Sequence, residues 1–130
     1  MTRYLLDTST LVDFSKGWEP SASQLLALID GGDEVAVCAI NVAEFYTGIP
    51  PEERPHWRRF LAALPHWVIT REAAERAGSC RYDLARQGQA LSLADALLAA
   101  VAQEYGATLI TENTKDFPLP GIRLLSLRNS

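Results

Sequence analysis

The sequence predicts an α/β fold built on a mostly parallel sheet. Short aliphatic or β-branched runs alternate with longer stretches in which apolar residues recur at helical spacing. The chain has 130 residues, so we expect one hydrophobic core and a single domain spanning 1–130. A hydrophobic fraction of 48% and a charged fraction of 22% exclude a disordered or low-complexity chain.

Five short runs are predicted as strands because they are rich in aliphatic or β-branched residues and are bounded by turns or helical stretches. The second run follows a clear turn signal, Asp-Gly-Gly-Asp at 30–33. The third and fifth runs carry weaker signals than the others. The predicted strands are Arg3–Leu6, Val35–Ala39, Trp67–Ile69, Thr108–Ile110 and Arg123–Leu125.

Helices are predicted between these strands. Apolar residues recur at i, i+3, i+4 and i+7 from Ala22, Val42, Trp57 and Ala94. A more polar helix is expected over 70–86. The helix from Leu93 to Tyr105 is started by Ser92 and stopped by Gly106. Strands joined by helices favour right-handed crossovers, which place a ligand site at the carboxyl ends of the parallel strands.

The charge and cysteine content exclude some classes of protein. The net charge is −4, which argues against a simple basic nucleic-acid sleeve. Only the segment 51–86 is positive, and its arginines are either phosphate-binding groups or an ordinary solvated helix face. Cys38 and Cys80 are predicted to be reduced core thiols. No membrane span or signal peptide is recognisable, so a cytoplasmic protein is expected.

Four carboxylates are placed by the predicted elements at one edge of the sheet. Asp7 ends the first strand, and Glu44 is expected in the first turn of the helix after the second strand. Asp95 begins a helix that must run opposite to the strand 108–110, and Asp116 follows that strand after a short loop. The four acids are therefore expected to converge on one rim.

Helix capping is the alternative explanation for these acids, and it stays open. Asp7 is placed to cap the helix that follows it, and Asp116 to stabilise a turn. The segments that contain Glu44 and Asp95 both fit a capping box. Asp95 differs from the others because it is the only polar residue in 93–102, so its carboxylate enters a largely apolar environment.

Such a cluster of carboxylates needs a counter-cation. At an effective dielectric of 20, two carboxylates about 4 Å apart repel each other by about 4 kcal/mol, and several pairs would exhaust the usual margin of stability. Carboxylate oxygens without cysteine or histidine select Mg²⁺ or Mn²⁺, and His56 and His66 are interpreted as structural or surface residues. These ions activate water and neutralise phosphate oxygens, so the sequence predicts phosphoester hydrolysis.

The residues around the four acids carry a family resemblance. The matching stretches are LLDTS at 5–9, VAEFY at 42–46, LADALLAAVA at 93–102 and GATLITENTKDF at 106–117. Together they resemble the PIN-domain ribonucleases and, among them, the VapC-like toxins of bacterial toxin–antitoxin pairs. The stretches span nearly the whole chain in the family's order.

The resemblance implies a PIN-like three-layer fold, with a four- or five-stranded parallel sheet flanked by helices. It implies a Mg²⁺- or Mn²⁺-dependent endoribonuclease that cleaves single-stranded regions of RNA. It also implies inhibition by a small antitoxin protein that inserts a segment near the site, and a homodimer. The implied acidic metal site consists of Asp7, Glu44, Asp95 and Asp116. The positions of the family's auxiliary polar residues are those of Ser9, Thr111 and Asn113.

Two rival functions remain as alternatives. A haloacid-dehalogenase-like phosphatase also begins with an Asp at the end of its first strand, but it needs a second Asp where Ser9 stands. A non-catalytic PIN-like binding module would use the acidic rim for a structural ion only. The apolar residues around Leu11, Val12, Phe14 and Trp18 are either core or part of a groove for the antitoxin.

Overall fold

The computed structural model describes residues 2–128, and a five-stranded sheet lies at its centre. The strand order is β3-β2-β1-β4-β5, and every neighbouring pair is parallel. This confirms the predicted parallel α/β fold. The strands are β1 (Arg3–Leu6), β2 (Glu34–Cys38), β3 (His66–Trp67), β4 (Thr108–Ile110) and β5 (Arg123–Leu125).

Helices and two short 3₁₀ turns connect the strands. The α-helices are α1 (Thr8–Ser15), α2 (Ser21–Asp30), α3 (Ala39–Thr47), α4 (Arg54–Ala62), α5 (Arg71–Arg86) and α6 (Leu93–Glu104). The 3₁₀ turns are η1 (Pro51–Glu53) and η2 (Thr114–Asp116). In the described range, no helix is long and apolar enough to cross a membrane.

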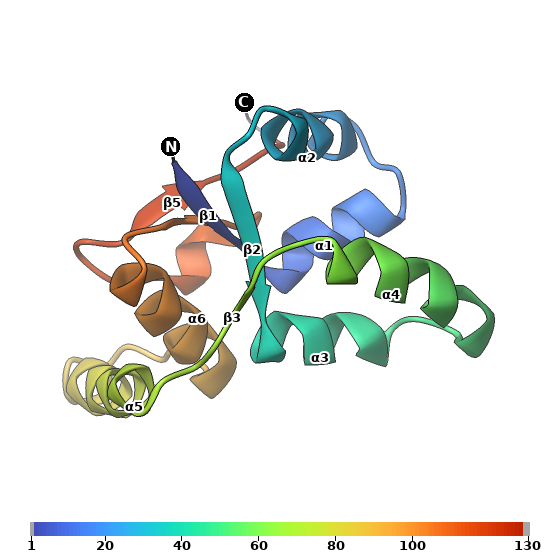
Figure 1. The fold of residues 1–130 in the computed structure, drawn as a ribbon. Coiled ribbons are helices and arrows are strands. Elements are labelled where there is room, and N and C mark those ends of the chain that lie inside the picture. Colours follow the sequence, from blue (N-terminus) through green and yellow to red (C-terminus); the bar gives the residue numbers. More distant parts are fainter. Residues whose placement is uncertain (1, 129–130) are drawn as a thin grey trace.

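The sheet has a separate hydrophobic cluster on each face, which gives three layers. Successive residues of β1 point to opposite faces, so Leu5 packs with α5 and α6 while Leu6 packs with the helices of the other side. Figure 1 shows α5 and α6 on one side of the central strands and α1, α3 and α4 on the other. Both leucines are fully buried, and β1 is the middle strand of the sheet, with a hydrophobic cluster on each side.

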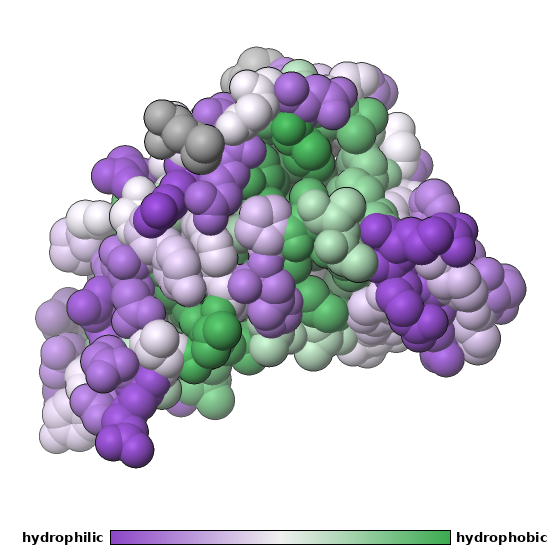
Figure 2. Space-filling model, viewed as in Figure 1, coloured by the Kyte–Doolittle hydropathy of each residue, from purple (hydrophilic) through white to green (hydrophobic). Residues whose placement is uncertain are grey.

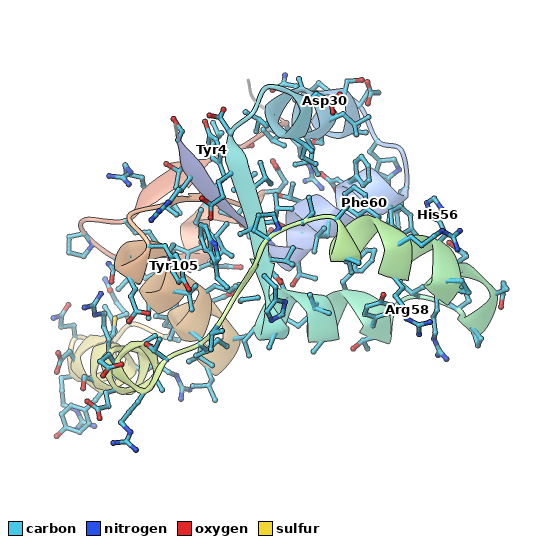
Figure 3. All side chains as sticks on the ribbon, in the orientation of Figure 1. Tyr4, Asp30, His56, Arg58, Phe60 and Tyr105 are labelled. Atoms are coloured by element: carbon cyan, nitrogen blue, oxygen red, sulfur yellow. The ribbon has the colours of Figure 1, made fainter. Side chains whose placement is uncertain are left out.

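The outer helices present hydrophilic surfaces. Figure 2 shows hydrophilic residues gathered over the far end of α4 and over α5. In Figure 3, His56 and Arg58 point outward from α4, whereas Phe60 faces α1. The ring of Phe60 stacks on that of Phe14, with the ring centroids 4.7 Å apart. Both His56 and His66 are exposed, in line with their interpretation as surface residues.

The predicted bounds of three strands agree with the structure, and those of two do not. β1, β4 and β5 have the expected bounds, whereas β2 begins and ends one residue earlier than expected. β3 was expected over 67–69 but occupies His66–Trp67, because only its first residues pair with Val37 and Cys38 of β2. Cys38 and Cys80 are free cysteines, of which Cys38 is a core residue as expected and Cys80 is only partly buried.

Candidate functional site

Asp7 caps α1 and also lies at the carboxyl edge of the sheet, so the two explanations for this residue hold together. Its backbone N–H donates to the carbonyl of Ile110 at 2.8 Å, which continues the pairing of β1 with β4. Its Oδ1 accepts the N–H of Thr8 at 2.8 Å, and the side chain is buried. One carboxylate oxygen therefore caps the helix, and Oδ2 is left for other partners.

Two hydroxyl groups donate to Oδ2 of Asp7. Thr111 donates at 2.7 Å and Ser9 at 3.1 Å. The same two hydroxyl oxygens accept backbone N–H groups of the loop after β4, from Asn113 and Glu112 respectively. This network fixes the orientation of the carboxylate and fastens the loop to the end of β1.

The pKa of Asp7 is raised from its ordinary value, chiefly because burial penalises the charged form. The hydrogen bonds from Thr111, Thr8 and Ser9 oppose that increase, and the charge of Glu44 adds to it. Asp7 is therefore a buried carboxyl whose ionisation depends on its three donors and is disfavoured by another acid of the cluster.

Glu44 lies at the same edge, but one turn farther along its helix than expected. Glu44 was expected in the first turn of its helix, and the segment 41–44 also fitted a capping box that begins at Asn41; both were wrong. α3 begins at Ala39, directly after β2, with Cys38 as its N-cap. Asn41 is the third helical residue, and its buried amide accepts from the N–H of Cys38 at 2.9 Å and donates to the carbonyl of Leu6.

The side chain of Glu44 is exposed and is held by α1. Its Oε1 accepts the hydroxyl of Thr8 at 2.6 Å. Thr8 is the first residue of α1, so this hydrogen bond joins the beginning of α1 to the second turn of α3. Thr8 also donates its N–H to Asp7, so Glu44 and Asp7 lie on either side of the same residue.

Asp95 is half-buried in the first turn of α6, where the hydroxyl of Ser92 accepts its N–H at 3.1 Å. Ser92 is the predicted N-cap. The pKa of Asp95 is raised from 3.8 to about 6, chiefly by burial and also by the charges of Asp7, Asp116 and Glu44. Hydrogen bonding of the Ser92 side chain to the Asp95 side chain opposes the shift. The negative charges of all three other acids therefore disfavour ionisation of Asp95.

The loop after β4 brings Asp116 and Asn113 to the site. Asp116 is exposed at the end of η2, and its N–H donates to the carbonyl of Asn113 at 2.9 Å. Asn113 lines the cavity beside the other acids, whereas Asp116 acts on Asp95 through its charge. Asp116 is therefore the most peripheral member of the predicted set.

A cavity of about 410 Å³ opens at this edge of the sheet. Three of the four acids line it, together with apolar residues and an arginine that pairs with Asp13. The cavity is lined by Asp7, Thr8, Ser9, Val12, Asp13, Trp18, Glu44, Asp95, Asn113 and Arg128. Among residues 2–128, no three or more His, Cys, Asp or Glu side chains are placed to hold a metal ion between them.

Five of the cavity residues were not predicted as site residues: Thr8, Val12, Asp13, Trp18 and Arg128. Asp13 is a buried charge within an apolar stretch of α1, a signal similar to the one that singled out Asp95. Trp18 was considered only as core or as part of a groove. Arg128 carries no local sequence signal, because its role depends on where the end of the chain folds back.

The basic segment 51–86 does not reach the cavity. Its arginines lie on α4 and α5, where they are exposed, and none of them lines this cavity. The solvated-face interpretation therefore fits them. Glu112 points elsewhere as well: its carboxylate accepts from the hydroxyl of Ser126 at 2.5 Å and from the N–H of Leu127 at 3.0 Å.

The apolar cluster near the start of the chain divides into core and surface. Leu11 is buried, and Val12 and Phe14 pack against the cluster that contains it. Trp18 lies beyond the end of α1 and is 49% exposed. Core packing therefore accounts for Leu11 and Phe14, whereas Val12 both packs against the core and lines the cavity. Trp18 presents a large exposed apolar surface to the same cavity.

Comparison with known proteins yields a family match over most of the chain. Residues 4–119 match the PIN domain. Ribonuclease VapC19 from Mycobacterium tuberculosis is 33% identical over 118 residues, which cover 88% of this chain and 92% of that protein. The tRNA(fMet)-specific endonuclease VapC from Shigella flexneri is 26% identical over 128 residues, covering 93% and 94%.

Solved structures share the fold. VapBC2 from Rickettsia felis, bound to a DNA fragment from its promoter, has a TM-score of 0.81 and 25% identity, with 96% of this chain and 98% of that chain covered. A toxin–antitoxin complex from Klebsiella pneumoniae has a TM-score of 0.76 and 30% identity, covering 92% and 94%.

Proposed function

Because the chain belongs to the PIN domain family, among its VapC-like members, we propose that it is a metal-dependent endoribonuclease and the toxin of a toxin–antitoxin pair. The environment of Asp95 carries the proposal. Asp95 shares one cavity with Asp7 and Glu44, and the charges of these two acids and of Asp116 all act on its half-buried carboxylate. Negative charge thus comes together from the end of β1, from α3, from α6 and from η2. A gathering of like charges that opposes folding is typical of a site that binds a cation.

The donor set fits a hard divalent ion. Asp7, Glu44, Asp95 and Asp116 would hold Mg²⁺ or Mn²⁺ through carboxylate oxygens, and no cysteine or histidine lines the cavity to favour zinc. Since no three of the described side chains are placed to hold an ion between them, an ion bound here would keep several of its waters, as Mg²⁺ does in proteins. Bound there, the ion would supply water activation and charge neutralisation on a phosphate.

The residues of the chain itself position the acids for this chemistry. Ser9 and Thr111 hold Oδ2 of Asp7 in one orientation, and Thr8 holds Glu44. Asn113 presents its side chain to the cavity, next to the place where a phosphate would enter. We infer that the three auxiliary residues Ser9, Thr111 and Asn113 orient carboxylates or substrate and do not act as nucleophiles.

Substrate and partner follow from the relatives. Ribonuclease VapC19 and the tRNA(fMet)-specific endonuclease VapC are both named for RNA cleavage, and we propose RNA as the substrate of this chain. Similar structures are toxin–antitoxin complexes, so we propose a small cognate antitoxin as its protein partner. We also propose that the protein acts in the cytoplasm. We propose in addition that it forms a homodimer, and light scattering of the purified protein tests this oligomeric state.

The decisive experiment replaces Asp7 with Asn. Purified wild-type protein with Mg²⁺ or Mn²⁺ should cleave single-stranded RNA, and Asp7→Asn should lose cleavage by at least about 100-fold while keeping or raising its melting temperature without metal. Unaltered cleavage by Asp7→Asn would refute the proposal. A protein that binds Mg²⁺ but never cleaves RNA would instead be the non-catalytic binding module.

The toxin assignment has its own test in growing cells. Expression of the chain alone should arrest growth, and co-expression of the short reading frame immediately upstream should relieve the arrest. Asp7→Asn serves as the control, because it should be harmless in both settings. Growth arrest by the Asn variant would show that toxicity does not come from this site.

A further inference from the structure

The residues that line the cavity beside the acids form two chemically different groups. We call Asp7, Glu44 and Asp95 the first wall. The second wall is the group around Asp13, in which Val12 and Trp18 are apolar and Arg128 pairs with the Asp13 carboxylate. A polyanion is repelled by the first wall unless a cation intervenes, whereas the second wall offers an exposed ring and a positive charge. The second wall therefore suits the part of an RNA strand that flanks the reacting phosphate.

Asp13 fixes the positive charge and lies against the backbone that carries the exposed ring. Its carboxylate, in a residue that is 1% exposed, accepts from Nε and Nη2 of Arg128, both at 2.8 Å. Its backbone carbonyl accepts the backbone N–H of Trp18 at 3.0 Å. Ser21 adds a donor to the same carboxylate at 3.4 Å. One buried residue thus contacts the guanidinium of Arg128 and the backbone of Trp18.

Arg128 keeps hydrogen-bonding capacity for a ligand. Its guanidinium uses Nε and one Nη2 proton on Asp13; within residues 2–128 no acceptor is found for the protons of Nη1 or for the second proton of Nη2. Its side chain is 50% exposed. A guanidinium held on one edge by a carboxylate is preorganised for a phosphate on its other edge.

Trp18 offers a stacking surface of the kind that binds unpaired bases. Its indole lines the cavity and is half exposed, and the Lys16 ammonium lies 4.9 Å from the ring centroid. Aromatic side chains beside cations bind single-stranded nucleic acid without reading its sequence. A basic inhibitor segment, in contrast, would meet repulsion from Lys16 and Arg128 at this wall.

We propose that Trp18 and Arg128 form a nucleotide subsite in which a base of single-stranded RNA stacks on the indole and an adjacent phosphate binds the guanidinium. This inference rests on the proposed function, since it places the nucleotide next to the acidic cluster. It assigns Trp18 and Arg128 to substrate binding and makes Asp13 a positioning residue.

The test measures RNA binding in an Asp7→Asn background with Mg²⁺, so that cleavage does not interfere. A fluorescent single-stranded RNA of about 10 nucleotides is the probe. Trp18→Ala should weaken binding about 10-fold or more, and Trp18→Phe should retain most of the affinity. The matched control is Tyr82→Ala, which removes an exposed ring that also carries a cation, Arg86, but lies outside the cavity.

The charge is tested with the double variant Asp13→Asn, Arg128→Gln, because removing Arg128 alone would leave a buried carboxylate unpaired. Its RNA affinity should fall several-fold, and the slope of log Kd against log salt should decrease by about 0.7. Thermal melting of each variant checks that it is folded. In the Asp7-containing enzyme, Trp18→Ala should raise KM and leave kcat within about 2-fold.

The outcomes separate this inference from the proposed function. Weaker RNA binding by Trp18→Ala in a protein that does not cleave RNA would support the subsite and refute the enzyme. Unchanged RNA binding by Trp18→Ala and the double variant, with cleavage intact, would overturn the subsite alone. If these variants lose affinity only for the protein encoded by the adjacent short reading frame, the wall is a docking surface and the subsite is again overturned.

Discussion

At the scale of single residues, the hydroxyl of Thr111 controls how readily Asp7 ionises. Burial raises the pKa of Asp7, and the hydrogen bond from Thr111 is the largest influence that lowers it. Thr111→Val keeps the shape of the side chain but removes the donor, so the pKa of Asp7 should rise further. We expect the acidic limb of the cleavage pH profile to move to higher pH, measured as kcat/KM against pH.

The matched control for this change lies on β4, the strand that Thr111 directly follows. Thr108→Val makes the same substitution two pairs away from the carboxyl end of β4, where Thr108 pairs with Tyr4 of β1. Its pH profile should match that of the wild type. A Thr111→Val profile that also matches the wild type would mean that the ionisation of Asp7 does not limit the reaction.

Asp95 makes the metal-free protein less stable as the pH rises. Its pKa is about 6 in the folded chain against 3.8 ordinarily, so the folded state binds the proton more tightly than the unfolded state. Its contribution to stability is therefore fully present below about pH 4 and is lost as the pH rises to about 6. After allowance for solvent screening, the loss should be about 1–2 kcal/mol.

Asp95→Asn should remove this pH dependence. In urea unfolding with a chelator present, the difference in unfolding free energy between pH 4.5 and pH 7 should be smaller for Asp95→Asn than for the wild type. Asp30→Asn, which changes an exposed acid of α2 away from the cavity, is the control and should behave as the wild type. Equal pH dependence in all three proteins would contradict the assignment to Asp95.

At the scale of elements, Asn41 fastens α3 to the central strand. Its buried amide joins the N–H of Cys38 to the carbonyl of Leu6, next to Asp7. Asn41→Ala leaves both backbone groups buried without that partner, so the unfolding free energy should fall by about 2–4 kcal/mol. Thr47→Ala, which removes an exposed hydroxyl bond within the same helix, should cost less than about 1 kcal/mol in the same urea titration.

The same contact explains which elements could be predicted from the sequence. β1, β4 and β5 were placed with the observed bounds because local aliphatic patterns and turns define them. The start of α3 was misplaced because it depends on Leu6, which is 35 residues from Asn41 in sequence. A cap that reaches across to another strand leaves no local pattern, so the resemblance to an Asn41 capping box was misleading.

The candidate site follows the same division. Topology alone predicted that Asp7, Glu44 and Asp95 lie together. Asp7 follows β1, Glu44 lies in the helix after β2, and Asp95 begins the helix that runs back to the start of β4. Arg128 was missed because its position depends on the chain end folding back across α1 to pair with Asp13. Sequence pattern therefore predicts the acidic residues of the cavity, whereas the position of Arg128 beside Asp13 is seen only in the tertiary structure.

At the scale of the whole molecule, repulsion within the acidic cluster should couple folding to divalent ions. The four acids come from the end of β1, from α3, from α6 and from η2. An ion that binds them would therefore link α3, on one face of the sheet, to α6, on the other face. Binding to the folded state alone stabilises it by about 2.7 kcal/mol when the ion is at 100 times its Kd. Added Mg²⁺ should therefore raise the melting temperature of the wild type by several degrees.

The double variant Asp7→Asn, Asp95→Asn separates site binding from general salt effects. Without metal it should melt at or above the wild-type temperature, because the two most strongly affected carboxyls no longer repel their neighbours. Mg²⁺ should add little to its stability, and Na⁺ at matched ionic strength should add little to either protein. Equal stabilisation of both proteins by Mg²⁺ would mean that the ion acts elsewhere on the surface, and that the carboxylates meet at the sheet edge without a divalent partner.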